Sequence, residues 1–191
     1  MFGALVVGIG AAVAIGISAV TSGTRTRPPV STHAAKPAAA GRCTLSDLHI
    51  HRIGSYAGLG QSGGYYGLTN VGGGTCSLRG WPYVVAIKAD GRRGTGERVQ
   101  ETFYGPFKAP RRPPTINLKP GATAAFALTT SDSPLGKQRT CPAPYRRLRV
   151  GLAKGSATTT LSAWIPYLGN YFQACTRFAV SEIVPRSDLR G

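Results

Sequence analysis

The chain has 191 residues, of which 42% are hydrophobic, so it can form one domain with extensions and is not a wholly disordered protein. Its 26 glycines and 14 prolines favour short strands joined by turns over long helices. A net charge of +16, from 23 basic and 7 acidic residues, gives a surface that attracts polyanions at low salt, although a basic surface without a dedicated partner is an equally good interpretation.

The chain begins with a long apolar segment, because residues 2–20 contain no charged side chain. A helix of this length is about 28 Å long, close to the thickness of a bilayer core. We therefore interpret residues 1–20 as an N-terminal hydrophobic helix that is either a cleaved signal peptide or a membrane anchor. The positive-inside rule, applied to Arg25 and Arg27, places the following chain in the cytoplasm, whereas the cysteines favour export.

Residues 21–42 are rich in Pro, Ala, Ser and Thr and lack aromatic side chains, which predicts a disordered linker. We expect one β-domain at residues 43–185 and a short tail at 186–191. The linker carries four basic residues and no acidic one, so the chain from residue 43 onward keeps 19 basic and 7 acidic residues, a charge of +12.

Four cysteines follow the apolar segment, an even number that favours two disulfides in an exported domain. Three pairings are possible, and we favour the sequential one because it closes two local loops of similar length. Each crosslink is expected to contribute about 3 kcal/mol by restricting the unfolded chain. The alternative, a structural zinc site, needs cysteines in close pairs, which this chain does not have. The favoured pairs are Cys43–Cys76 and Cys141–Cys175.

Short apolar or alternating runs recur through the domain at intervals typical of an antiparallel β-sandwich. After residue 43, no segment keeps a helical period over three turns. The run at 116–130 is expected to hold an edge strand, a Lys-Pro-Gly turn and a core strand. The predicted strand regions are 47–53, 64–71, 82–89, 98–103, 116–130, 146–152, 157–165 and 176–184.

The run RRLRVGL at 146–152 indicates how its strand is oriented. Leu148 and Val150 share one face and Arg147 and Arg149 share the other, as in a one-sided antiparallel sheet with its charge outward. Further basic residues fall in two stretches that look like loops, 90–98 and 108–114. They are Arg92, Arg93, Arg111 and Arg112.

The stretch LTNVGGGTCSLRGWP at 68–82 is expected to be a strand, a turn and a return. The glycines at 72–74 permit backbone angles that other residues avoid. Cys76 begins the return, Trp81 is expected to cover its disulfide, and Pro82 stiffens the entry to the next strand.

Five motifs occur in the order CTLSDL at 43–48, GLTNVGGGTCSLRGWP at 67–82, LKPGATAAFAL at 118–128, CPAP at 141–144 and a last cysteine at 175. In this order they resemble the domain of unknown function 4232, which is found in exported actinobacterial proteins and lipoproteins. The second motif is the most specific, and the resemblance covers about residues 43–185. It implies an extracytoplasmic, immunoglobulin-like antiparallel β-sandwich with two disulfides. It implies no catalytic residue, and without a lipobox it implies no lipid anchor.

Two glycine motifs overlap in the region before the second predicted strand. GLGQSG at 58–63 matches a dinucleotide fingerprint, but the glycine-rich sequence after it does not begin a helix, so we interpret it as a chance match in a flexible loop. GQSGG at 60–64 matches a hydrolase elbow around Ser62. All three histidines precede Ser62, which excludes the chain order of that fold.

His49 and His51 alternate along one predicted strand and therefore point to the same side. Two histidines can begin a metal site, but no third ligand is evident and His33 lies in the linker. Exposed strand histidines are the better interpretation, and we predict neither a metal nor a cofactor.

Aromatic residues gather in SAWIPYLGNYFQAC at 162–175. Near basic residues, they are able to bind a sugar, a base or a partner protein. The plainer interpretation is that they cover the end of the sandwich around Cys175. The residues are Trp164, Tyr167, Tyr171 and Phe172.

We expect a non-catalytic cell-envelope domain, secreted or anchored by residues 2–20, that binds through its basic and aromatic surfaces. Its expected partner is an anionic envelope polymer or another envelope protein, with membrane contact through the N-terminal segment if it is uncleaved. The alternatives are a hydrolytic envelope enzyme and a nonspecific binder of polyanions or nucleic acid. Export and the lack of a nucleic-acid-binding motif disfavour nucleic acid. The expected surface comprises Trp164, Tyr167, Tyr171, Phe172, Arg92, Arg93, Arg111, Arg112, Arg147 and Arg149.

Overall fold

The computed structural model of this chain describes residues 40–58, 60–98, 112–131, 133–134, 139–175 and 177–188, and the structural statements below concern these residues. Contacts divide the chain into two units, Met1–Pro37 and Ala38–Gly191. The expected hydrophobic helix and nearly all of the expected linker lie outside the described residues. Within those residues, no helix is long and apolar enough to span a membrane.

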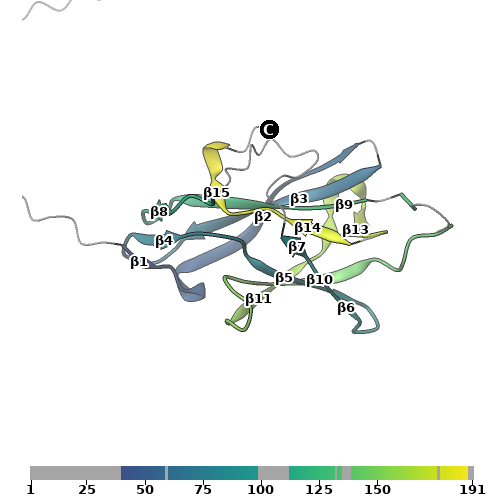
Figure 1. Cartoon of the computed structure of the whole chain (residues 1–191), viewed down its shortest axis with the longest axis horizontal. Coiled ribbons are helices and arrows are strands. Elements are labelled where there is room, and N and C mark those ends of the chain that lie inside the picture. The colour runs from purple at the N-terminus through teal and green to yellow at the C-terminus, as the bar shows by residue number, and fades with distance from the viewer. Residues whose placement is uncertain are drawn as a thin grey trace, which may run out of the picture. The chain divides into compact units, whose positions relative to one another are not determined.

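The described part of the second unit consists of strands of two to eleven residues with single turns of 3-10 helix between some of them (Figure 1). The strands are β1 (Gly41–Arg42), β2 (Leu48–Gly58), β3 (Gln61–Asn70), β4 (Cys76–Leu78), β5 (Tyr83–Lys88), β6 (Arg93–Thr95), β7 (Glu97–Arg98), β8 (Ile116–Leu118), β9 (Thr123–Ser131), β10 (Tyr145–Gly151), β11 (Thr158–Ser162), β12 (Trp164–Ile165), β13 (Asn170–Tyr171), β14 (Phe178–Val180) and β15 (Val184–Pro185). The 3-10 turns are η1 (Leu45–Asp47), η2 (Pro166–Leu168) and η3 (Arg186–Asp188).

Two larger sheets form the body of this unit (Figure 1). The first has the order β2-β3-β9-β14-β7, with β15 also paired to β9, and the second has the order β11-β10-β5-β6. The small sheets β1-β4-β8 and β12-β13 complete the set. Among the described strands, only β1 with β4 and β14 with β7 run parallel.

One core lies between the two larger sheets, because strands of both turn alternate apolar side chains toward it. Phe126 of β9 stacks on Tyr66 of β3 with ring centroids 5.3 Å apart. From the other sheet, Leu148 and Val150 of β10 are buried against the same cluster. The predicted β-rich domain is confirmed, and so is the inward face predicted for β10.

Two disulfides crosslink the domain in the favoured pairing, Cys43–Cys76 and Cys141–Cys175. The first joins the end of β1 to the start of β4. The second joins the segments that precede β10 and β14. Their sequence separations are 33 and 34 residues, for which chain entropy predicts about 4 kcal/mol of stabilisation each, rather than the value of about 3 kcal/mol expected above.

The buried side chain of Asn70 organises the turn after β3. Its Nδ2 donates to the carbonyl oxygens of Gly74 at 2.8 Å and Leu118 at 2.9 Å, and its Oδ1 accepts from the N–H of Gly72 at 2.9 Å. Its backbone N–H and its backbone carbonyl oxygen each form a hydrogen bond with the turn between β8 and β9. One amide therefore fixes the glycine turn against β8.

The glycines at 72–74 do not adopt the unusual backbone angles that we expected. None of them has φ in the left-handed region, whereas Gly80 has φ of +94°. The hydrogen bonds of Asn70 hold the turn instead. Gly72 leaves room for them, because a Cβ there would lie 3.2 Å from Oδ1 of Asn70.

Two segments that we expected to be loops contain strands. In 90–98, Arg93–Thr95 pairs with β5 and Glu97–Arg98 pairs with β14. The expected loop at 58–63 is the hairpin between β2 and β3, so a strand, not a helix, follows the glycine motif. Nearly all of the strand expected at 98–103 lies outside the described residues.

One of the two edge strands of the six-stranded sheet, β2, carries an inward-pointing charge. It has a bulge between Arg52 and Gly54, and Nη2 of Arg52 donates to the phenol oxygen of Tyr66 at 2.8 Å. The Arg52 guanidinium carbon also lies 5.0 Å from the Tyr66 ring centroid. Burial raises the pKa of Tyr66 to about 12, so the phenol stays neutral and the charge of Arg52 is not cancelled.

Glu182, which lies between β14 and β15, is an ionisable residue that is fully buried, with 0% of its surface exposed. Neither carboxylate oxygen has a hydrogen-bond partner among the described residues. Burial raises the pKa of this carboxyl above its ordinary value of 4.5. Folding therefore shifts the protonation equilibrium of Glu182 toward its neutral form.

The substitution Asn70→Asp tests the role of the buried amide. It removes the Nδ2 donor with little change of size and leaves the carbonyls of Gly74 and Leu118 unpaired. We expect the free energy of unfolding to fall by about 2–4 kcal/mol, measured by denaturant unfolding of the oxidised protein. The exposed control Asn117→Asp should change it by less than about 0.5 kcal/mol, and equal losses would contradict the assigned role.

Glu182 predicts a pH dependence of stability. Because the folded-state pKa is raised, its contribution is fully present below about pH 4.5 and is lost as the pH rises through the folded value. Glu182→Gln should remove this dependence and stabilise the fold at neutral pH, because a neutral amide replaces a buried carboxylate. Denaturant unfolding of both proteins from about pH 4 to about pH 8 measures the difference, which should grow with pH; a constant difference would refute the assignment.

Candidate functional site

The outer face of the four-stranded sheet brings together three of the six arginines predicted from the sequence, Arg93, Arg147 and Arg149. In β10, Leu148 and Val150 point into the core, so Arg147 and Arg149 project outward and are exposed. Pairing with β5 and β11 carries the same face across the sheet. The alternation read from the sequence therefore placed these two arginines correctly.

Strand registers arrange this face in two rows, because residues directly opposite each other share a face. Successive rows are about 6.7 Å apart, the step of two residues along a strand. The first row is Arg93, Ile87, Arg147 and Ser162, and the second is Thr95, Val85, Arg149 and Thr160.

The rows combine the guanidinium groups of the arginines with the apolar side chains of β5 between them. Ile87 is 8% exposed yet does not belong to the core cluster. Its neighbours in the row are Arg93 and Arg147, whose aliphatic stems are suited to covering it while their charged ends stay in water. On the second row, Arg149 donates from Nε and Nη2 to the Thr158 hydroxyl, at 3.1 and 2.9 Å.

An aromatic cluster continues this face at the end of β11. The alternation of β11 runs on into β12, so Ala163 and Ile165 are buried while Trp164 is 40% exposed. Trp164 meets its cross-strand partner Tyr171 edge-to-face, with centroids 5.0 Å apart. The guanidinium carbon of Arg146 lies 4.1 Å from the Tyr171 centroid.

Backbone hydrogen bonds attach the hairpin of β12, η2 and β13 to β10. The N–H of Ala163 donates to the carbonyl of Arg146, and the N–H of Tyr145 donates to the carbonyl of Phe172. The aromatic cluster is therefore held by the same strand that carries the arginines. We call Arg93, Arg146, Arg147, Arg149, Trp164 and Tyr171 the basic-aromatic face.

Two predicted aromatic residues lie apart from this face. Phe172 is 1% exposed and packs in the core edge-on against Phe178, so its place among the surface residues was wrong and the plainer interpretation holds for it. The alternation of the hairpin turns Tyr171 outward and Phe172 inward. Tyr167 is 76% exposed on η2, at the tip of the hairpin.

The other predicted arginines do not join the face. Arg92 lies in the turn between β5 and β6 and pairs with Asp90 at 2.7 Å. Arg112 is exposed just before β8, on a separate stretch of chain. Arg111 lies outside the described residues. Sequence reasoning missed Arg146, whose ring contact depends on the bulge between Tyr145 and Arg147.

The residues of the hydrolase alternative lie on opposite faces of one sheet. Ser62 is buried in β3 opposite Thr130, whereas His51 pairs with Gly67, five residues further along β3. Five residues along a strand span about 16 Å, and an odd number of steps reverses the face. His49 and His51 stack on each other with centroids 4.9 Å apart, and the described residues contain no cluster of three or more possible metal ligands.

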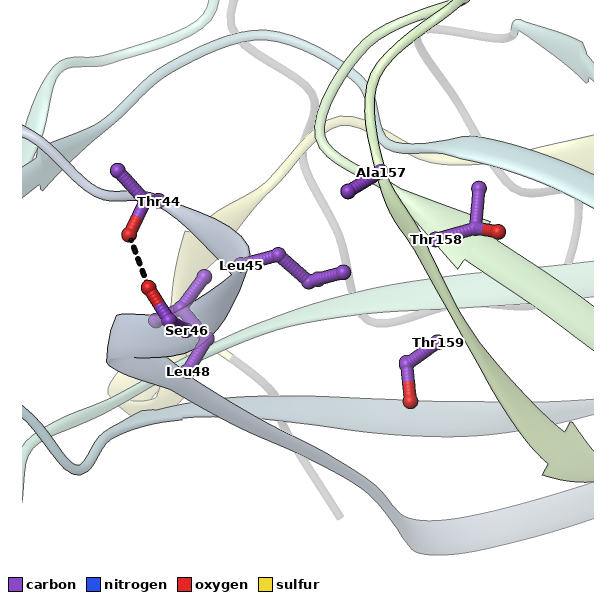
Figure 2. A pocket seen from close by; sticks show the side chains of 7 residues that line it. All are labelled: Thr44, Leu45, Ser46, Leu48, Ala157, Thr158 and Thr159. Carbon is purple, nitrogen blue, oxygen red and sulfur yellow. Dashed lines mark hydrogen bonds between the residues drawn. The ribbon is translucent and has the colours of Figure 1, made fainter.

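A shallow hollow of about 500 Å³ lies between η1 and β11 (Figure 2). Figure 2 shows the side chain of Leu45 pointing across it toward Ala157 and Thr158. Several of its hydroxyls are already engaged, because Thr44 bonds to Ser46 and Asp47, and Thr158 accepts from Arg149. Few unpaired polar groups remain there for a ligand.

Comparison with known proteins adds a family assignment. One family model, described as Domain of unknown function (DUF4232), matches residues 43–182. No curated protein and no solved structure matches the chain. The family match agrees with the motifs and covers most of the sequence, so this chain belongs to the DUF4232 family.

Proposed function

We propose that this chain is a non-catalytic binding domain of the cell envelope that holds an anionic envelope polymer on its basic-aromatic face. The two disulfides favour an oxidising, extracytoplasmic compartment. In this proposal the domain is secreted or anchored by residues 2–20. Two larger sheets around one core support an immunoglobulin-like sandwich as its architecture.

The observation that carries the proposal is that no carboxylate among the described residues forms an ion pair with an arginine of this face. Among the described residues, the ion pairs are Arg92 with Asp90 and Arg177 with Glu97, and neither involves an arginine of the basic-aromatic face. Guanidinium groups without carboxylate partners are available to carboxylates or phosphates of a ligand. The Trp164 and Tyr171 rings beside them offer flat surfaces for sugar rings.

Paired substitutions of equal charge test this function. Arg147→Gln with Arg149→Gln should weaken cosedimentation of the oxidised chain with isolated cell-wall material about tenfold at physiological salt, because two charge-assisted contacts are lost. The control, Arg112→Gln with Lys119→Gln, removes the same charge away from the face and should weaken it less than about twofold.

Repeating the cosedimentation over a range of salt concentrations, with DNA as competitor, separates this proposal from nonspecific attraction. Specific binding should persist at physiological salt, resist competition by DNA, and fall when Trp164 is changed to Ala. If both double variants lose binding equally, and wall and DNA release the chain at the same salt concentration, only generic charge attraction remains and the proposed function is wrong.

A further inference from the structure

A second hollow, of about 600 Å³, lies beside the first disulfide, and none of its described lining residues belongs to the basic-aromatic face. Its lining includes Cys43, Arg42, Arg79 and Trp81, with Leu78 and Leu152 as apolar wall. Hollows of this size accept small organic ligands.

The pairing of β1 with β4 explains why two arginines meet there. Arg42 lies opposite Ser77 in parallel register, and Arg79 follows two residues after Ser77. Paired strands are about 4.8 Å apart and two residues span about 6.7 Å, so both long side chains reach one small group. The N–H of Cys43 donates to the carbonyl of Ser77 at 3.0 Å, and the Cys43–Cys76 bond locks the same two segments.

The turn at Gly80 brings an indole ring to the arginines. Gly80 has φ of +94°, which a residue with a side chain rarely adopts, and Trp81 follows it. The Gly80 carbonyl accepts from the N–H of Ile183 at 2.8 Å, which fixes the turn to the body of the domain. Trp81 is half-buried and lines the hollow.

The chemistry of the lining defines the ligand. The described lining residues include two arginines and no acidic side chain, and neither arginine belongs to an ion pair among the described residues. We propose that this hollow binds a small organic anion, in which a carboxylate or phosphate monoester is attached to a flat or aliphatic group. The guanidinium groups bind the anion, and Trp81 with the leucines contacts the apolar part.

Tryptophan fluorescence tests this site separately from the basic-aromatic face. The chain has two tryptophans, so in Trp164→Phe the only indole is Trp81. The oxidised full-length chain, in mild detergent, is titrated with phenyl phosphate and benzoate. At least one of them should give a saturable change, while inorganic phosphate and benzyl alcohol should bind at least about tenfold more weakly, because each offers only half of the required chemistry.

Variants in the same background locate the binding. Arg42→Gln and Arg79→Gln should each weaken it about fivefold or more, whereas Arg93→Gln on the basic-aromatic face should leave it unchanged. In the complementary variant Trp81→Phe the fluorescence comes from Trp164, and the same titration should give no saturable change of that fluorescence. The proposal is overturned if benzyl alcohol binds as well as both anions, if the three arginine variants behave alike, or if Trp164 reports the same titration.

Discussion

The arrangement of the first half of the domain depends on the hydrogen bonds formed by the buried side-chain amide of Asn70. Its three hydrogen bonds join the glycine turn to β8 and leave none of its own polar atoms unpaired. The turn delivers Cys76 to the start of β4, where it bonds to Cys43. Without this amide, the chain would have to bury unpaired carbonyls at the point where three segments meet, at a cost comparable to a large part of a small domain's stability. The hollow at Arg42 and Arg79 is a product of the same geometry.

Six of the 23 basic residues gather in two chemically different places. On the four-stranded sheet, arginines lie in two rows of the outer face, which suits the extended ligand with repeated charges that we propose. Beside the first disulfide, two guanidinium groups and an indole ring surround a hollow, which suits a compact ligand with one charge. Because the two places are built from different strands, the two proposed ligands would not compete directly for the same residues.

Local patterns predicted the elements that rest on alternation, and contacts between distant segments account for the errors. Leu148 and Arg149 follow a period of two, which any one-sided sheet imposes. The strand at Arg93–Thr95 gains its hydrogen bonds from β5, and nothing in its own basic sequence indicates a strand. Phe172 was assigned to the surface because its segment is rich in aromatic residues, and the inward–outward alternation of neighbouring side chains was not considered. The contact of Arg146 with Tyr171 depends on a bulge, which inserts a residue and has no sequence signature here.

The inward charge on β2 has a consequence for the behaviour of many copies of this domain together. An exposed edge strand offers unpaired backbone groups to any other edge, and this is a route to aggregation. β2 is eleven residues long and would make a good template if it were flat and apolar. The bulge after Arg52 breaks its register, and a second strand docked there would have to bury the guanidinium further from water. Arg52 therefore opposes the addition of further strands at this edge, so copies of the domain can be held at high local concentration without their sheets joining.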